Sequence, residues 1–155
     1  MLKKTNAHFE KIKKQLEAYE EAKKTYEKRK QELIVTEGWD SENLNALCKN
    51  KPEFPISQGA CKAYYAWRQS IERKETELEL DCALWDNEVA DFVDCLRIAG
   101  IDWFIYTNQS SFVMRNLRAF AKEGCIMEGF CTIKRTEHRF EKNSEEDIPG
   151  IRFIV

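Results

Sequence analysis

Residues 2 to 34 carry a regular hydrophobic stripe and contain neither glycine nor proline. Apolar side chains recur there at spacings of three, four or seven residues: Leu2, Phe9, Ile12, Leu16, Tyr19, Tyr26 and Leu33. This heptad-like spacing predicts one long amphipathic helix. Lys23 and Lys30 interrupt the stripe, but their aliphatic stems can pack while the ammonium groups stay in water. Because such a helix is unstable alone, we expect a second element to cover its apolar face.

A second stripe follows a break between Gly38 and Pro55. Gly38 is expected to end the first helix, and Asp40 or Ser41 to cap a short helix through Cys48. Ser57 is placed to cap a long helix with the same three, four and seven spacings: Ala60, Tyr64, Trp67, Ile71, Leu78, Cys82 and Trp85. We predict that this helix continues past residue 80 and pairs with the first helix as an antiparallel hairpin.

From residue 85 onward, helical and extended patterns alternate. Asp86 is expected to cap a helix that ends at Gly100, and residues 101–106 read as a strand. A helix from Ser110 or Ser111 to Gly124 precedes a long strand with a bulge at Gly129. A polar loop over residues 141–150 and a final strand over residues 151–155 complete the chain. The first strand, the helix and the second strand are predicted to form a right-handed parallel crossover.

These patterns predict an α+β fold. An N-terminal antiparallel helical hairpin is expected over residues 1–84, followed by a small helix-strand-helix-strand-strand domain over residues 85–155. The length of 155 residues suits one medium domain, or a small domain with an appendage.

Composition narrows the functional classes. Charged residues make up 34% of the chain, above the usual fraction of about 25%, so much of it should be solvated helix surface. The formal net charge of −2 does not indicate a general polyanion binder. No apolar run approaches about 18 residues, so no membrane span is expected. Six cysteines without a C-x-x-C motif, and no secretory signal, indicate reduced thiols and a cytoplasmic protein.

No group of residues predicts catalysis or metal binding. The two histidines, His8 and His138, are far apart in the sequence. Cys125 and Cys131 would lie roughly 20 Å apart on one strand, too far apart for one zinc ion. We therefore expect no catalytic residue, no metal and no cofactor.

The first helix carries the clearest charge asymmetry. Residues 1–34 hold ten Lys or Arg and six Glu, a net of +4, and the remaining residues sum to −6. Its basic cluster is a candidate partner-binding surface: Lys23, Lys24, Lys28, Arg29 and Lys30. Tyr65 is added to this surface as an aromatic side chain expected to be exposed, because it cannot share one seam with Tyr64 and Trp67. The alternative is an ordinary solvated helix with Glu–Lys pairs.

The segment "TNQSS" lies where a strand becomes a helix. A helix N-terminus has unpaired N–H groups and a partial positive charge, so Thr107, Asn108, Gln109 and Ser110 are candidate anion-binding or nucleotide-binding residues. The segment lacks the glycine on which phosphate-binding loops depend, which favours simple helix capping as the alternative.

The chain from about Trp85 to its end resembles a small, largely uncharacterised α+β domain of mobile-element proteins in Gram-positive gut bacteria. The matching residues are "DFVDCLRIAGIDWFIYTNQSS", Leu117, "GC" at 124–125, "GF" at 129–130 and "PGIRF" at 149–153. The resemblance implies an accessory protein of a phage, plasmid or conjugative element. Such proteins include inhibitors of host machinery, anti-CRISPR proteins among them.

The expected function is therefore a non-enzymatic protein-binding accessory protein, with a CRISPR-Cas nuclease as one target to consider. The first alternative is a nucleic-acid-binding regulator that uses the basic helix. The second is a small nucleotide-binding module at residues 107–111. A protein or nucleoprotein partner is expected, and no membrane. The sequence leaves the partner's identity, and the choice between a monomer and a helix-mediated dimer, open.

Overall fold

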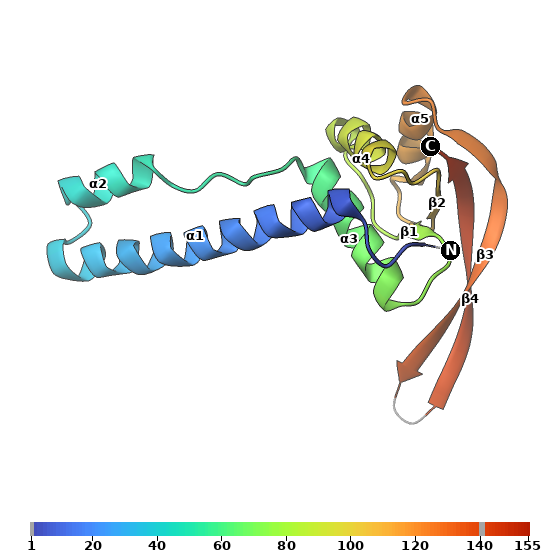
Figure 1. Cartoon of the computed structure of the whole chain (residues 1–155), viewed down its shortest axis with the longest axis horizontal. Coiled ribbons are helices and arrows are strands. Elements are labelled where there is room, and N and C mark those ends of the chain that lie inside the picture. Colours follow the sequence, from blue (N-terminus) through green and yellow to red (C-terminus); the bar gives the residue numbers. More distant parts are fainter. Residues whose placement is uncertain (1, 140–141) are drawn as a thin grey trace. The chain divides into compact units, whose positions relative to one another are not determined.

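The computed structural model describes residues 2–139 and 142–155, with side chains described for residues 2–135 and 145–155. Within these ranges it contains five helices and a four-stranded sheet, which confirms the α+β class (Figure 1). The elements are α1 (Ala7–Glu37), α2 (Glu42–Lys49), α3 (Gln58–Glu72), β1 (Leu78–Leu80), α4 (Asp86–Ile98), β2 (Trp103–Tyr106), α5 (Val113–Lys122), β3 (Ile126–Arg139) and β4 (Lys142–Ile154). They form two compact units: unit 1 holds Met1–Phe9 and Ser57–Val155, and unit 2 holds Glu10–Ile56.

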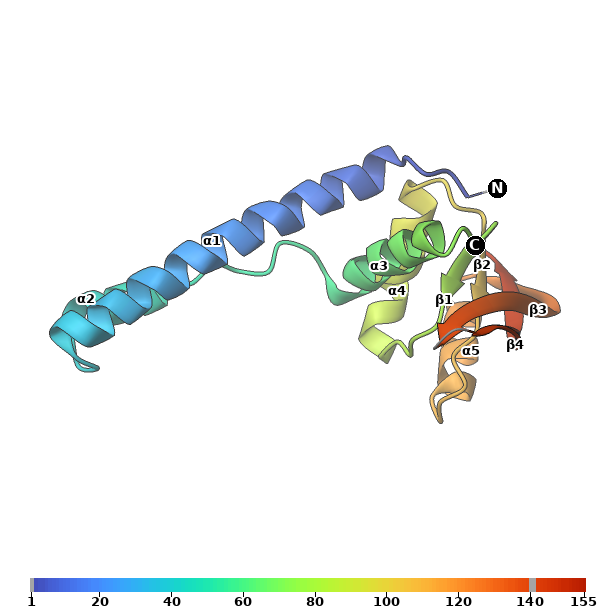
Figure 2. The same cartoon turned by 90° about the horizontal axis from the view of Figure 1, so that it is seen from below.

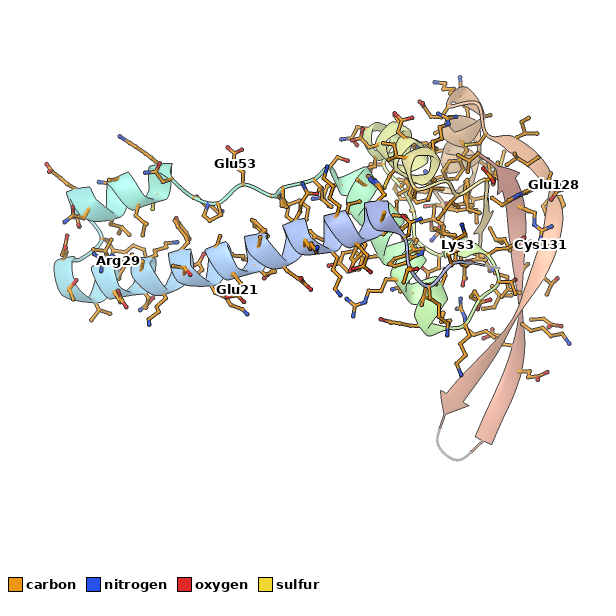
Figure 3. The ribbon with its side chains drawn as sticks, viewed as in Figure 1. Lys3, Glu21, Arg29, Glu53, Glu128 and Cys131 are labelled. Atoms are coloured by element: carbon orange, nitrogen blue, oxygen red, sulfur yellow. The ribbon has the colours of Figure 1, made fainter. Side chains whose placement is uncertain are left out.

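Unit 2 is a helical hairpin whose turns follow local sequence signals. Helix α1 ends at Glu37, and Gly38 follows it in the left-handed region with a φ of 84°. The Ser41 hydroxyl accepts a hydrogen bond from the Leu44 N–H at 3.3 Å and caps α2. In Figure 3, Glu21 projects from α1 away from the extended segment that follows α2. Glu53 lies in that segment and projects outward from it.

The second arm of the hairpin differs from the prediction. The apolar face of α1 within unit 2 is covered by α2 and the extended segment after it. The Tyr26 hydroxyl lies 3.7 Å from Cys48 Sγ, and the Tyr19 ring packs edge-on against Phe54 at a centroid distance of 5.2 Å. A short helix and an extended chain therefore replace the long second helix along this face.

Helix α3 is shorter than the sequence suggested. Ser57 caps it as predicted, through the Ala60 N–H at 3.2 Å, but the helix ends at Glu72. Lys74 then takes a left-handed φ of 60°, and residues 78–80 form β1. The spacing of Leu78 and Cys82 fits a helix, but Leu78 and Leu80 also alternate as a strand requires. The parallel ladder to β2 selects the strand.

The sheet has the order β1-β2-β4-β3. Strand β2 is parallel to β1 and antiparallel to β4, and β3 is antiparallel to β4. Strands β2 and β3 therefore run in the same direction, as the predicted crossover required, but β4 lies between them. Strand β4 also begins at Lys142, so residues expected in a polar loop are instead paired with β3. The predicted bulge is confirmed between Met127 and Gly129.

The core of unit 1 is aromatic. Phe92 of α4, Phe104 of β2, Phe120 of α5 and Phe153 of β4 are buried, and neighbouring ring centroids lie 5.0–6.2 Å apart. Helices α4 and α5 therefore pack on one face of the sheet (Figure 2). Since β1 pairs with β2 and α3 packs on α4, residues 57–84 belong with this core. A division at residues 84 and 85 would cut through unit 1.

Candidate functional site

The junction after β2 uses its polar side chains internally. The four candidate anion-binding residues are Thr107, Asn108, Gln109 and Ser110. Thr107 is buried, and its hydroxyl donates to the Glu79 carboxylate at 2.6 Å. The Asn108 amide donates to the Asp81 carbonyl at 3.0 Å, and its oxygen accepts from the Ser110 N–H at 3.1 Å. The Ser110 hydroxyl in turn accepts from the Phe112 N–H, whereas Gln109 is exposed. These contacts favour turn formation over anion binding, and α5 itself begins after Phe112 without a side-chain cap, so the expected cap from Ser110 or Ser111 is not found.

The basic residues of α1 alternate with acidic ones. The set is Lys23, Lys24, Lys28, Arg29 and Lys30; all are exposed except Lys30, which is half-buried. Lys24 pairs with Glu21 at 3.4 Å and Arg29 with Glu32 at 3.2 Å. Unit 2 as a whole contains ten Lys or Arg and ten Asp or Glu, so its formal net charge is zero. Within unit 2, the net charge of +2 on residues 10–34 is balanced by −2 on residues 35–56, and the other two positive charges of residues 1–34, Lys3 and Lys4, belong to unit 1.

Tyr65 lies in α3, which belongs to unit 1, whereas the basic cluster of α1 belongs to unit 2. It is 46% exposed, and its ring packs edge-on against the buried Tyr64 at a centroid distance of 5.3 Å. The exposure expected for this residue is therefore found, whereas a role in binding stays a prediction.

One cysteine–histidine contact was not anticipated. The structure places His8 Nε2 3.4 Å from the Cys95 Sγ. Burial raises the pKa of the Cys95 thiol to about 12. A thiol with that pKa is protonated at neutral pH, and the thiolate is the nucleophilic form. The side chain of His138 lies outside the described residues. Among the described residues, no group of three or more His, Cys, Asp or Glu side chains is arranged to hold a metal ion.

The N-terminal segment borders a cavity of about 600 Å³ in unit 1, whose lining includes Trp67 and Trp103. Several polar groups in its wall are already bonded. The Leu2 N–H donates to the Thr76 carbonyl at 2.8 Å, and the Trp67 indole donates to the Lys3 carbonyl at 3.3 Å. These hydrogen bonds anchor the N-terminal segment, so the polar groups that form them are not available to bind a ligand in the cavity.

Helix α5 presents three cations on one side. At about 100° per residue, Arg115, Arg118 and Lys122 fall within about 60° of one another around the helix axis. Phe120 lies on the opposite side and is fully buried against the sheet. The amphipathic pattern of "VMRNLRAFAK" therefore fixes which side meets water: burying Phe120 forces the three cations outward.

These cations line a groove between α4 and α5, of about 410 Å³, which we call the α4–α5 groove. Val89 and Ala119 contribute apolar surface to it, and Asp86 and Glu123 lie among its lining. The Arg97 guanidinium of α4 donates to the Glu123 carbonyl at the end of α5, at 2.6 Å. This bond links the two helices at one end of the groove.

Arg115 is held in place by contacts within the domain, whereas Arg118 and Lys122 are not. Its guanidinium contacts the Asp86 carboxylate at 2.8 Å and lies 5.6 Å from the centroid of the Phe112 ring. Both members of this ion pair are more than half exposed, so we expect it to orient Arg115 and to add little stability. Arg118 and Lys122 are exposed, and neither has a hydrogen-bond or ion-pair partner among the described side chains.

An aromatic pair adjoins Arg115. The Trp85 and Phe112 rings pack edge-on at a centroid distance of 5.2 Å, and Trp85 is 57% exposed. Met114, on the same helix as Arg115, is 75% exposed. Trp, Arg and Met are the residue types enriched at protein interfaces. Apolar and cationic surface therefore lie next to each other at this end of α5.

This surface was not predicted from the sequence. The available signal was the i, i+3, i+7 spacing of Arg115, Arg118 and Lys122 within a helix that the sequence predicted. The position of Trp85 beside Phe112 required the packing of α4 against α5 and could not be read from the spacing.

Comparison with known families bears on the same part of the molecule. Residues 62–155 match a family described as a domain of unknown function, DUF7698. The chain belongs to this family. The DUF7698 region includes most of α3 and all of β1, so it begins further toward the N-terminus than the domain expected from residue 85. The whole α4–α5 groove lies within it. No curated protein and no solved structure matches the chain. None of the helices in residues 2–139 and 142–155 combines the length and apolar character that crossing a bilayer requires.

Proposed function

We propose that this chain is a non-enzymatic protein-binding protein whose contact surface is the α4–α5 groove with its Trp85–Phe112 rim. The observation that carries the proposal is the placement of exposed cations of α5 next to the exposed Trp85 ring, which packs against the half-buried Phe112 at the start of α5. Arg118 and Lys122 lack partners among the described side chains, so both are available for ionic contacts with another molecule.

The chemistry of the candidate reactive groups supports binding over catalysis. Cys95 has a histidine within 3.4 Å, but burial keeps it a protonated thiol at neutral pH. A nucleophilic role would require a mechanism that lowers the thiol pKa, and desolvation acts in the opposite direction.

Two other candidate surfaces are less well supported. A nucleic-acid-binding helix should concentrate positive charge on one face, but α1 mixes both signs and belongs to a neutral unit. A nucleotide site at residues 107–110 would have to break contacts that Thr107 and Asn108 make with unit 1 itself.

The finer proposal concerns the cellular setting. The resemblance of residues 85–155 to mobile-element proteins supports an accessory protein that inhibits host defence, with a CRISPR-Cas nuclease as the target. Adding the purified protein to such a nuclease and its guide should suppress cleavage of target DNA at equimolar concentration. Undiminished cleavage at a tenfold excess would remove this target.

The groove itself is tested by paired charge reversals. In the variant Arg118→Glu/Lys122→Glu, partners captured from the cells that naturally produce the protein should be lost. The control Lys23→Glu/Lys24→Glu makes the same change of charge on α1 and should retain them. Quantitative mass spectrometry of the captured proteins provides the measurement. Equal capture by all three proteins would contradict the assignment of this surface, and circular dichroism checks that both variants fold.

A further inference from the structure

We infer that the α4–α5 groove recognises a short extended protein segment carrying two carboxylates two residues apart, next to one apolar side chain. This inference rests on the proposed function and specifies the chemistry of the partner. It depends on the spacing of the cations, the position of the aromatic rim and the charge of the surrounding unit.

The spacing of the two unpaired cations matches an extended chain. Arg118 and Lys122 are four residues apart on α5, so their backbone positions differ by about 6 Å along the helix axis. In an extended segment, side chains i and i+2 share one face and lie about 6.6–6.8 Å apart. Two acidic residues at positions i and i+2 can therefore meet Arg118 and Lys122 together.

The aromatic rim places an apolar subsite at one end of this row. Arg115 lies about 4.5 Å from Arg118 along the axis, on the side away from Lys122, and it contacts the Phe112 ring. Trp85 packs against that ring and keeps more than half of its own surface exposed. An apolar side chain next to the acidic pair would therefore bury Trp85 surface while the carboxylates reach Arg118 and Lys122.

The charge of unit 1 favours a protein segment over a nucleic acid. Unit 1 contains fifteen Lys or Arg and seventeen Asp or Glu, a net of −2. Asp86 and Glu123 also line the groove itself. Binding to a phosphate backbone requires a broad positive surface and many phosphate contacts. A local group of three cations within an acidic unit suits a ligand with a few carboxylates.

The test uses the full chain and a fluorescein-labelled, serine-based peptide of nine residues with one phenylalanine and two glutamates spaced i, i+2. Two versions place the phenylalanine before or after the glutamates, because the direction of the segment is open. Fluorescence anisotropy should show saturable binding of at least one version. Replacing both glutamates by glutamine should weaken it by at least about tenfold, because charge-assisted hydrogen bonds are lost.

Variants locate the binding to the groove. Arg118→Glu/Lys122→Glu should abolish peptide binding, whereas Lys23→Glu/Lys24→Glu should leave it unchanged. Trp85→Ala should weaken binding of the phenylalanine-containing peptide more than binding of the same peptide with alanine in place of phenylalanine. A twenty-residue oligothymidine, added as a competitor, should not displace the peptide.

The outcomes separate this inference from the proposed function. If neither peptide binds, yet cellular partners still require Arg118 and Lys122, the acidic motif is wrong and the binding surface stands. Equal binding of the glutamine peptide, or tighter binding of the oligonucleotide, also overturns the inference. Loss of charge dependence in both the peptide and the capture experiments would overturn the two proposals together.

Discussion

At the scale of single residues, Asn116 shows how one buried polar side chain organises the DUF7698 domain. It is fully buried in α5. Its amide nitrogen donates to the Leu84 carbonyl at 2.6 Å, and its oxygen accepts from the Leu84 N–H at 3.0 Å and from the Tyr106 hydroxyl at 2.7 Å. It therefore satisfies three polar groups from the segment before α4 and from β2, and it joins both to α5.

Replacing Asn116 by alanine should lower the free energy of unfolding by about 3–5 kcal/mol, because three buried groups lose a partner at once. Tyr106→Phe is the matched control. It removes one hydroxyl and leaves the two Leu84 bonds, so we expect a loss of about 1 kcal/mol. Urea denaturation measures both. Similar losses in the two variants would contradict the organising role of Asn116.

At the scale of elements, the crossing of α3 and α4 depends on Gly59. A β-carbon added there would meet the Glu88 carbonyl oxygen at a clashing distance and the Phe92 backbone nitrogen at 2.8 Å. Backbone atoms in a packed helix cannot move aside cheaply. The two helices can therefore approach this closely only with glycine at the contact.

Gly59→Ala should destabilise the protein by about 2–3 kcal/mol, even though alanine raises helix propensity by about 1 kcal/mol. Gly129→Ala is the control, since nothing lies within 4 Å of a β-carbon at Gly129 and its φ is not positive. The free energy of unfolding of Gly129→Ala should stay within about 0.5 kcal/mol of that of the unchanged protein. Thermal or urea unfolding distinguishes the two, and a neutral Gly59→Ala would show that the helices can separate freely.

A buried ion cluster joins β1 to β3. Glu79 of β1 is 1% exposed in its side chain and contacts Arg135 of β3 and Arg73, the residue after α3. One guanidinium nitrogen of Arg135 donates to both carboxylate oxygens of Glu79, at 2.6 and 2.5 Å. These two strands lie at opposite ends of the sheet order, so the cluster connects two strands that share no backbone ladder.

A double-mutant cycle with Glu79→Leu and Arg135→Met should reveal coupling of at least about 1 kcal/mol. Glu79→Leu removes the carboxylate that Arg135 contacts, and Arg135→Met leaves the buried Glu79 with Arg73 as its remaining cation, whereas the double change removes both members of the pair. The exposed pair Arg68–Glu72 is the control, with an expected coupling of about 0.5 kcal/mol or less. Urea denaturation of the four proteins in each cycle provides the values. Additive effects at Glu79 and Arg135 would mean that the pair does not hold β3 against β1.

At the scale of the whole molecule, alkaline pH should weaken the fold. Burial raises the pKa of Cys95 from about 9 to about 12 and that of Tyr106 from about 10 to about 12. The folded state therefore holds these protons more tightly than the unfolded chain does. The stability that the protonated Cys95 and Tyr106 side chains contribute to the folded state is complete below pH 9 and is lost as the pH rises toward 12.

The midpoint of urea unfolding should accordingly fall between pH 9 and pH 11. Lysine side chains also titrate in this range, so the decisive comparison is with Cys95→Ala/Tyr106→Phe. This variant is less stable at pH 8 but should show a shallower decline. Parallel declines in the two proteins would indicate that other groups control the alkaline loss.

The sequence alone determined the features that depend on local chemistry. Gly38, Gly100 and Gly124 all follow helices in the left-handed conformation that glycine adopts without strain. Ser41 and Ser57 cap the helices that they were expected to cap, because a hydroxyl can satisfy an N–H of the same turn. The order of helices and strands after residue 85 follows from the same signals.

Tertiary structure decided the rest. Residues 72–80 carry no glycine or proline to mark the end of α3, and Leu78 fits both periods, so only pairing with β2 makes β1 a strand. Polar residues near 142–150 extend β4 because β3 supplies their ladder. The α4–α5 groove likewise depends on packing. Spacing places Arg115, Arg118 and Lys122 on one helix face, with Phe112 at the start of the same helix, but only contacts between residues distant in the chain bring Trp85 and Asp86 beside them.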